Sequence, residues 1–380
     1  MSASDLTEER DALRETARRL LDNESSPERV RAVMEEPVGH DANLWRTMAG
    51  LGWHGLAVAE EYGGAGYSFA ELAVVLEELG RHLTPSPFFS TAVLGASALL
   101  AGADERTKSD LLPRLCAGEL IVALATAPIP RGGGPTVQRT PSGYLLDGMA
   151  AFVADAHVAH LLVVAANHRE DPDSATLFLL DRHAEGVSVR VLPTLDRTRR
   201  LCEVRFERVT LEPEAVLGEP SHAAPLVDWI VDKAAVALAA DCVGGAERVM
   251  EMCADYASHR VQFGRPIGTF QAIKHRCADM LILVEASRAA AEEAARTSPS
   301  KPGPSTSAAV AKSYAGDAYA RIASDGIQLH GGVGFTWEHD IHLYFKRAKL
   351  NQVWFGDPSW HRSRLANLLL PRGAIRSSPP

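Results

Sequence analysis

The chain has 380 residues, of which 46% are apolar and 23% are charged, and its formal net charge is −9. These values are ordinary for globular proteins and exclude a fibrous or largely disordered chain. The acidic balance disfavours nucleic-acid binding through a general basic field, and no stretch approaches the roughly 20 apolar residues of a membrane-spanning helix. The five cysteines lack CxxC spacing and no export signal precedes them, which predicts reduced thiols in a cytoplasmic protein.

Residues 1–117 are predicted to form a helical domain. In the segment SFAELAVVLEELGRHL, one helical face carries apolar residues at i, i+3, i+4 and i+7, namely Leu72, Val75, Leu76 and Leu79. Ser68 and Glu71 have the spacing of a capping box, and Gly80 is placed to end the helix.

Residues 118–222 are predicted to form a β domain. Short apolar runs such as LLVVAA and ATLFLL alternate with turn residues, and residues 202–207 alternate apolar and charged side chains with a period of two. We expect an antiparallel arrangement, because parallel βαβ units would need helices for which the segment has no room.

Residues 223–380 are predicted to be helical again. Long alanine-rich segments cover 231–260, 278–298 and 308–329, and SPSKPGPSTS interrupts them as a solvated loop. The fold class expected from the three parts is α+β, mostly α, with a middle β domain between two helical ones.

Two glycine-containing motifs mark the last part. RVQFGRPIGTFQ, residues 260–271, reads on its own as a helix end with Gly264 as a stop and a proline turn. QLHGGVGF, residues 328–335, is either a simple turn between helices or a glycine loop whose amides cradle a pyrophosphate. WEHDIH lacks the HExxH spacing of a metal site, so we expect surface histidines at a helix start and no metal ion.

Together, these segments resemble the acyl-CoA dehydrogenase family over almost the whole chain. The resemblance is carried by LGWHGLAVAEEYGGAGYSFAELAVVLEELGR, by YASHRVQFGRPIGTFQAIKHRCADM and by DGIQLHGGVGFTWEHD. It implies an α-helical domain, a middle β-barrel and a C-terminal four-helix bundle. It also implies FAD as cofactor and desaturation of an acyl-CoA thioester, in which a carboxylate takes the Cα proton and flavin N5 takes a hydride from Cβ.

The resemblance implies an intact set of residues for the nucleotide end of FAD. The family's RxxFG…Q and QxxGG motifs are present as Arg260, Gln271, Gln328, Gly331 and Gly332. In the family's dimers these groups reach the adenosine-diphosphate end of the neighbouring subunit's FAD. The fixed charge and forked donors of an arginine suit that pyrophosphate.

The flavin end differs from the family pattern. The family's TEPGAGSD loop, which lies along the flavin, reads TAPIPRGGG here; Thr126 and Pro128 are retained, but the acid is Ala127. The later W/F-I-T/S-N segment reads FVAD at residues 152–155, and its flavin-bonding hydroxyl is replaced by Ala154.

The usual catalytic carboxylate is also missing. The family's glutamate before a glycine corresponds to Phe355, and the following threonine corresponds to Asp357. Some relatives carry the glutamate on the first bundle helix, where this chain has Ala234. Neither side chain can accept a proton.

A displaced base stays open as an alternative. Asp232, Asp357 and His361 lie near the usual positions in sequence, and Asp357 is the nearest substitute; the alternative role of Asp357 is a cap in the GDP turn. The resemblance otherwise implies the degenerate, non-catalytic subunit of an actinobacterial heterotetrameric acyl-CoA dehydrogenase. Its implied partners are a homologous catalytic subunit, a bulky or steroid-derived acyl-CoA and an electron-transferring flavoprotein. A self-sufficient homo-oligomer, or a flavoprotein with oxygenase-like chemistry, is the alternative.

Overall fold

The computed structural model describes residues 3–127, 133–172 and 174–370. Its first part is helical. The helices are α1 (Ala3–Glu24), α2 (Pro27–Glu35), α3 (Ala42–Gly50), α4 (Phe69–Arg81), α5 (Ala96–Gly102) and α6 (Glu105–Cys116), with short turns at Trp53–Gly55 and Glu60–Tyr62 and a π-helical segment, η3, at Phe89–Gly95. Within the described residues, no helix is long and apolar enough to cross a membrane.

A sheet forms the middle part. Its strands are β1 (Val122–Ala125), β2 (Thr136–Thr140), β3 (Gly143–Ala154), β4 (Leu161–His168), β5 (Ala175–Asp181), β6 (Val187–Val191), β7 (Leu201–Leu211) and β8 (Val216–Leu217). The order is β6-β7-β3-β2-β4-β5-β8, with β1 beside β4. The expected antiparallel arrangement is wrong at two pairs, because β1 and β2 both run parallel to β4. The β2–β3 hairpin supplies the connection for which we had expected a helix to be necessary.

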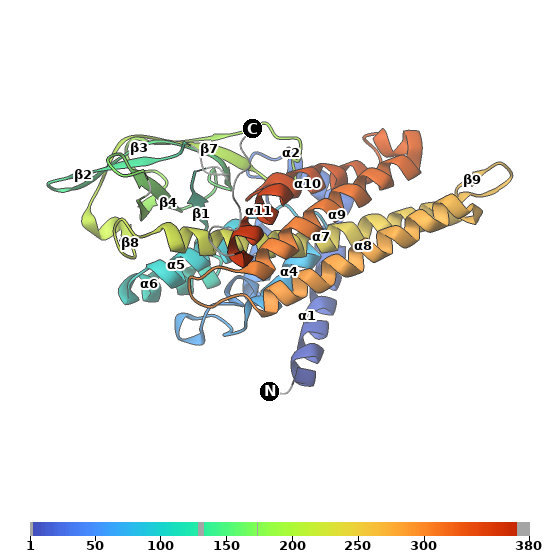
Figure 1. The fold of residues 1–380 in the computed structure, drawn as a ribbon, viewed down its shortest axis with the longest axis horizontal. Coiled ribbons are helices and arrows are strands. Elements are labelled where there is room, and N and C mark those ends of the chain that lie inside the picture. The colour runs from blue at the N-terminus through green and yellow to red at the C-terminus, as the bar shows by residue number, and fades with distance from the viewer. Residues whose placement is uncertain (1–2, 128–132, 173, 371–380) are drawn as a thin grey trace.

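The last part is a helical bundle of α7 (Ala224–His259), α8 (Gln271–Arg296), α9 (Thr306–His330), α10 (Ile341–Val353) and α11 (Pro358–Leu369). Figure 1 shows α7, α8 and α9 along the long axis of the molecule, with the sheet at one end and the β9 (Val261–Gln262)–β10 (Arg265–Pro266) hairpin at the other. The predicted class, mostly α with a middle sheet and C-terminal helices, is confirmed.

The start of α4 agrees with the sequence prediction, but its end does not. The Ser68 hydroxyl and the Glu71 carboxylate form the predicted capping box. Gly80 lies inside the helix, which continues to Arg81. A side chain at Gly80 would collide with the Asp241 carbonyl of α7, so this glycine permits a close helix crossing and is not a stop.

The first C-terminal motif agrees with its prediction at the helix end, where Arg260 is the C-cap, but not at Gly264. The helix α7 ends at His259, before Gly264 is reached. Phe263 and Gly264 both have positive φ, at 54° and 77°, and they connect β9 to β10. Two consecutive residues of positive φ are typical of a type I′ hairpin turn, which explains the glycine.

Candidate functional site

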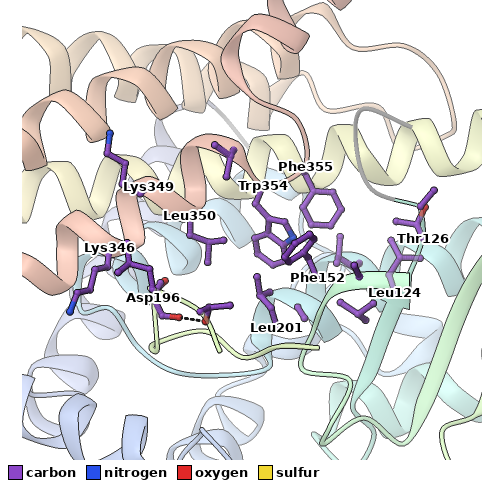
Figure 2. A pocket seen from close by; sticks show the side chains of 18 residues that line it. Leu124, Thr126, Phe152, Asp196, Leu201, Lys346, Lys349, Leu350, Trp354 and Phe355 are labelled. Atoms are coloured by element: carbon purple, nitrogen blue, oxygen red, sulfur yellow. Dashed lines mark hydrogen bonds between the residues drawn. The ribbon is translucent and has the colours of Figure 1, made fainter. Parts of the chain in front are cut away.

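The predicted site residues come together in two separate regions. The first, called here the inner cavity, lies between the sheet and the C-terminal end of α10 and has a volume of about 410 Å³. Thr126, at the end of β1, lines it together with Phe152, Ala154 and Phe355. Figure 2 shows the Phe152, Trp354 and Phe355 rings converging at its centre. Pro128 lies outside the described residues.

Two residues with unusual backbone angles, one at an irregularity within β3 and one in the turn after α10, shape the inner cavity. Phe152 and Phe355 both have positive φ, at 59° and 55°. The turn after α10 is held by the buried Lys312 ammonium, which donates to the carbonyls of Gln352 and Gly356 at 3.2 and 3.0 Å. Burial lowers the pKa of Lys312 to about 8. The backbone that carries Phe355, at the predicted glutamate position, is therefore held in place by Lys312.

A buried ion cluster lies behind the inner cavity. Arg347 contacts Asp196 at 2.9 Å and Asp241 at 3.1 Å, and Arg199 contacts Asp241 at 2.6 Å. The Arg347 side chain is only 1% exposed. The Arg199 guanidinium also lies 5.4 Å from the centre of the Trp354 ring. Side chains thus fill the interior next to the aromatic wall, where the remaining space is about 20 Å³.

The nearby carboxylates proposed as substitute bases have structural partners. Asp357 is the N-cap of α11, and its carboxylate accepts the Trp360 backbone N–H at 2.8 Å. Asp232 pairs with Arg364 and accepts the Ser305 backbone N–H at 3.1 Å. Neither side chain lines the inner cavity.

The histidine and the second glutamate position do not supply a base at the inner cavity either. His361 is fully buried, its Nε2 lies 3.0 Å from the Phe355 carbonyl oxygen, and burial lowers its pKa to about 3. Ala234 is fully buried in α7 and carries no polar side-chain atom.

One acid near the inner cavity was missed as a candidate. Asp155 lies directly after β3 with φ 55°, and its carboxylate accepts the Ser90 hydroxyl at 2.8 Å. Burial raises its pKa to about 7, which the Ser90 hydrogen bond and the neighbouring Arg199 oppose. Its sequence signal was visible as the final residue of FVAD, but its burial depends on packing from distant segments.

The second region, called here the distal hollow, lies where α7 and α9 end and has a volume of about 530 Å³. Arg260, Gly331 and Gly332 line it, with Tyr256 and His330 beside them. The Arg260 side chain is exposed and has no hydrogen-bond or ion-pair partner in the described part of the chain. A Cβ atom at Gly331 or Gly332 would meet nothing within 4 Å, so the backbone there is open to a ligand.

The predicted glutamines flank the distal hollow without lining it. Gln271 begins α8 and Gln328 lies in the last turn of α9, and both are exposed. Phe263 and Phe335 nearby are 91% and 81% exposed. Exposed aromatic side chains beside an open arginine are typical of a surface that another molecule covers.

The two regions lie at opposite ends of α10. This helix has 13 residues, which corresponds to a length of about 20 Å at 1.5 Å per residue. Gln262 of β9 lines the distal hollow, and Figure 1 shows the β9–β10 hairpin at the opposite end of the molecule from the sheet. The two sets of predicted site residues therefore lie at separated surfaces of this chain.

The histidine expectation is partly wrong. His342 and His330 are buried, with exposed fractions of 8% and 4%, because the chain after α9 folds back over them. His330 stacks on Tyr256 with ring centres 4.4 Å apart. No group of three potential ligands for a metal ion occurs among the residues the structure describes.

The two regions fit FAD unequally. The distal hollow offers a free guanidinium and open glycine backbone, which suit a pyrophosphate. The inner cavity presents alanine at positions 127 and 154, where the resembled family has an acid and a hydroxyl. An isoalloxazine has a polar edge that needs hydrogen-bond partners when buried, so the described lining fits a flavin poorly.

Comparisons with known proteins agree over nearly the whole chain. Residues 7–119 match the profile of the acyl-CoA dehydrogenase N-terminal domain, and residues 225–370 match that of its C-terminal domain. The chain is 36% identical over 361 residues to acyl-CoA dehydrogenase IpdE2 of Mycolicibacterium smegmatis, covering 95% of this chain and 98% of the relative. It is 38% identical over 342 residues to IpdE2 of Mycobacterium tuberculosis, covering 90% of this chain and 91% of the relative.

Two solved structures are similar in fold as well as sequence. The Tcur3481-Tcur3483 steroid ACAD variant superposes with a TM-score of 0.85 at 32% identity, covering 96% of this chain and 98% of that one. The ChsE4-ChsE5 complex from Mycobacterium tuberculosis superposes with a TM-score of 0.87 at 27% identity, covering 95% and 98%. On these matches, the chain belongs to the acyl-CoA dehydrogenase family.

Proposed function

We propose that this chain is the non-catalytic subunit of a hetero-oligomeric, FAD-dependent acyl-CoA dehydrogenase. The observation that carries the proposal is the contrast between its two regions. Phe355 stands at the predicted glutamate position in the wall of the inner cavity, while Arg260 and the Gly331–Gly332 backbone remain open at the surface. The homologous partner subunit supplies the carboxylate base and the flavin pocket.

The residues of this chain serve the partner's cofactor. Bound FAD would supply the hydride acceptor for the α,β-desaturation. Arg260 holds the negative charge of the pyrophosphate, and Gly331 and Gly332 let backbone N–H groups approach the same phosphates. Gln271 and Gln328 lie at the rim, where their amides can bind the nucleotide. All of these contacts bind and orient the cofactor, and none moves a proton.

The relatives support both the assembly and the substrate class. The similar ChsE4-ChsE5 structure is a complex of two named chains, and the Tcur3481-Tcur3483 protein is a steroid ACAD. We therefore propose a heterotetramer that acts on a bulky or steroid-derived acyl-CoA. An electron-transferring flavoprotein as acceptor rests on the family resemblance. The five unpaired cysteines fit the expected cytoplasmic, reducing setting.

A self-sufficient dehydrogenase is the second candidate, and Asp155 is the observation that favours it. A carboxyl group with a pKa of about 7 is suited to general base catalysis near neutral pH. Asp155 lies beside Ala154 and Trp354, which also line the inner cavity. This candidate requires flavin reduction by an acyl-CoA with this chain alone, and loss of that reduction in Asp155→Asn.

The trans contact is tested with Arg260→Ala in the complex with the catalytic subunit. Hydrogen bonds between an arginine and a phosphate contribute about 1.5–3 kcal/mol each, so we expect FAD to bind at least about tenfold more weakly. Arg205→Ala, on the sheet strand β7, is the control and should leave FAD affinity unchanged. FAD affinity is measured by fluorescence titration of the apo complex. Unchanged affinity in Arg260→Ala, with the assembly intact, would contradict the assignment.

A further inference from the structure

The inner cavity has walls that suit an apolar ring system. Three aromatic rings, those of Phe152, Trp354 and Phe355, converge at its centre (Figure 2), and leucine, valine and alanine side chains complete most of the lining. A volume of about 410 Å³ falls in the range of pockets that bind small organic molecules. The family's flavin-bonding acid and hydroxyl are replaced by Ala127 and Ala154, which removes polar groups from this lining.

Positive charge lies at one end of the inner cavity. The Lys346 and Lys349 stems line that end, and Figure 2 shows their amine tips turned toward the outside. Neither lysine forms a salt bridge within the described ranges; their ammonium groups lie 5.0 Å from the Trp337 ring and 5.5 Å from the Phe345 ring. The carboxylate of Asp196 also belongs to the lining, but it accepts hydrogen bonds from Arg347 and Thr198.

The mouth of the inner cavity exposes apolar side chains to solvent. Phe152, Leu195 and Val353 are 52%, 62% and 57% exposed, although each lines the same cavity. Their exposure is unfavourable until an apolar surface covers them. An interior of rings, an apolar mouth and two unpaired lysines together favour a ligand that is apolar at one end and anionic at the other.

We propose that the inner cavity binds an amphipathic organic anion, with a fused-ring hydrocarbon body between the aromatic side chains and an acidic head beside Lys346 and Lys349. The site is then an accessory binding site on the non-catalytic subunit. This inference rests on the proposed function, because it requires that no flavin occupies the cavity. A flavin would leave its polar edge largely unpaired against the described lining, whereas a hydrocarbon ring system has no such edge.

The test uses deoxycholate, below its micelle-forming concentration, as a probe with fused hydrocarbon rings and one carboxylate. Calorimetric titration of the purified full chain should give saturable binding at one site, with a change in Trp354 fluorescence. The methyl ester of deoxycholate, which has no charge, should bind at least tenfold more weakly. The coenzyme A thioester of deoxycholate is titrated in parallel with the free acid. If the thioester binds more tightly, its phosphates lie at the lysines. If the free acid binds more tightly, its carboxylate lies there.

Variants locate the site. The double variant Lys346→Glu/Lys349→Glu should weaken deoxycholate binding at least tenfold, and Leu350→Trp should abolish it by filling the cavity. Lys301→Glu, in the exposed loop before α9, is the matched control and should bind as the parent does. Because Leu350→Trp can disturb packing, the thermal unfolding of each variant is compared with that of the parent. The comparison of Lys346→Glu/Lys349→Glu with the control Lys301→Glu decides the test even if Leu350→Trp does not fold.

The outcomes separate this inference from the proposed function. Absence of saturable deoxycholate binding, or equal binding by the parent and the double lysine variant, overturns the inference. If the same chain purifies without FAD, the proposed function still stands. Displacement of deoxycholate by flavin mononucleotide, in a chain that also purifies with FAD, overturns both.

Discussion

On the proposed function, Phe355 and Ala154 replace side chains that hold lone pairs in the acyl-CoA dehydrogenase family. Lys312 fixes the turn that carries Phe355, and the Arg199 guanidinium lies 5.4 Å from the centre of the Trp354 ring. A glutamate introduced at Phe355 would face the inner cavity from the same turn. The loss of the base would then accompany the loss of the family's polar groups at Ala127 and Ala154.

Another buried residue, His54, predicts how stability depends on pH. Its side chain is 1% exposed, neither ring nitrogen has a partner among the described residues, and it packs on Trp45 with ring centres 3.8 Å apart. Burial lowers the pKa of His54 to about 3, below its unfolded value of 6.5. The unfolded state thus binds the proton more readily, so stability falls as pH drops below about 6.5 and keeps falling to about 3.

We expect His54 to lower the free energy of unfolding by on the order of 3 kcal/mol at pH 4.5 relative to pH 8. The variant His54→Leu should flatten the decline of the unfolding free energy over this range, measured by urea denaturation at several pH values. His275→Leu, at an exposed position of α8, should leave the slope as it is. Equal slopes in all three proteins would contradict the predicted burial of a neutral imidazole. His361 has a similarly lowered pKa and should account for part of the slope that remains.

At the scale of elements, the crossing of α4 and α7 joins the two helical parts. The glycines Gly80 and Gly244 let the backbones approach, since a Cβ at Gly244 would collide with the Glu77 carbonyl. The ion pair of Arg288 with Glu247 lies close to the same crossing. We propose domain limits of 1–117, 118–222 and 223–380, and this crossing predicts that the first and last parts unfold together.

A glycine-to-alanine change at the crossing and a control change in α9 should alter the free energy of unfolding in opposite directions. Gly244→Ala forces the new methyl group against the Glu77 backbone of α4 and should destabilise the protein by about 1–3 kcal/mol. Gly316→Ala, within α9, meets its nearest atom at 3.6 Å and should stabilise by up to about 1 kcal/mol, because alanine restricts the unfolded chain and favours helix. Chemical denaturation of each variant gives both numbers. A neutral Gly244→Ala would show that the helices are not closely packed there.

At the scale of the whole molecule, the proposed function assigns nucleotide binding to the distal hollow and flavin binding, where it occurs in the family, to the inner cavity. Arg260 and the open glycines lie at one end of α10, and Phe355 lies at the other. On the proposed function, one subunit can keep nucleotide binding after losing flavin binding, because the two regions have no lining residue in common.

The sequence predicted the order of the parts and the local helix start at Ser68, because periodicity and capping depend on neighbouring residues. Its motifs also contain residues that the structure gathers in each region, such as Thr126 in the inner cavity and Arg260 in the distal hollow. It did not predict the role of Gly80, the parallel pairing of β1 with β4, or the burial of Asp155. Those features depend on contacts between segments that are far apart in the chain, which no local pattern encodes.

The most direct test is the flavin content of this chain purified alone and in complex with its glutamate-bearing homologue, measured by absorbance and protein concentration. We predict essentially no FAD in the chain alone and one FAD for each pair of subunits in the complex. One FAD per subunit in the chain alone, reduced by an acyl-CoA, would contradict the account.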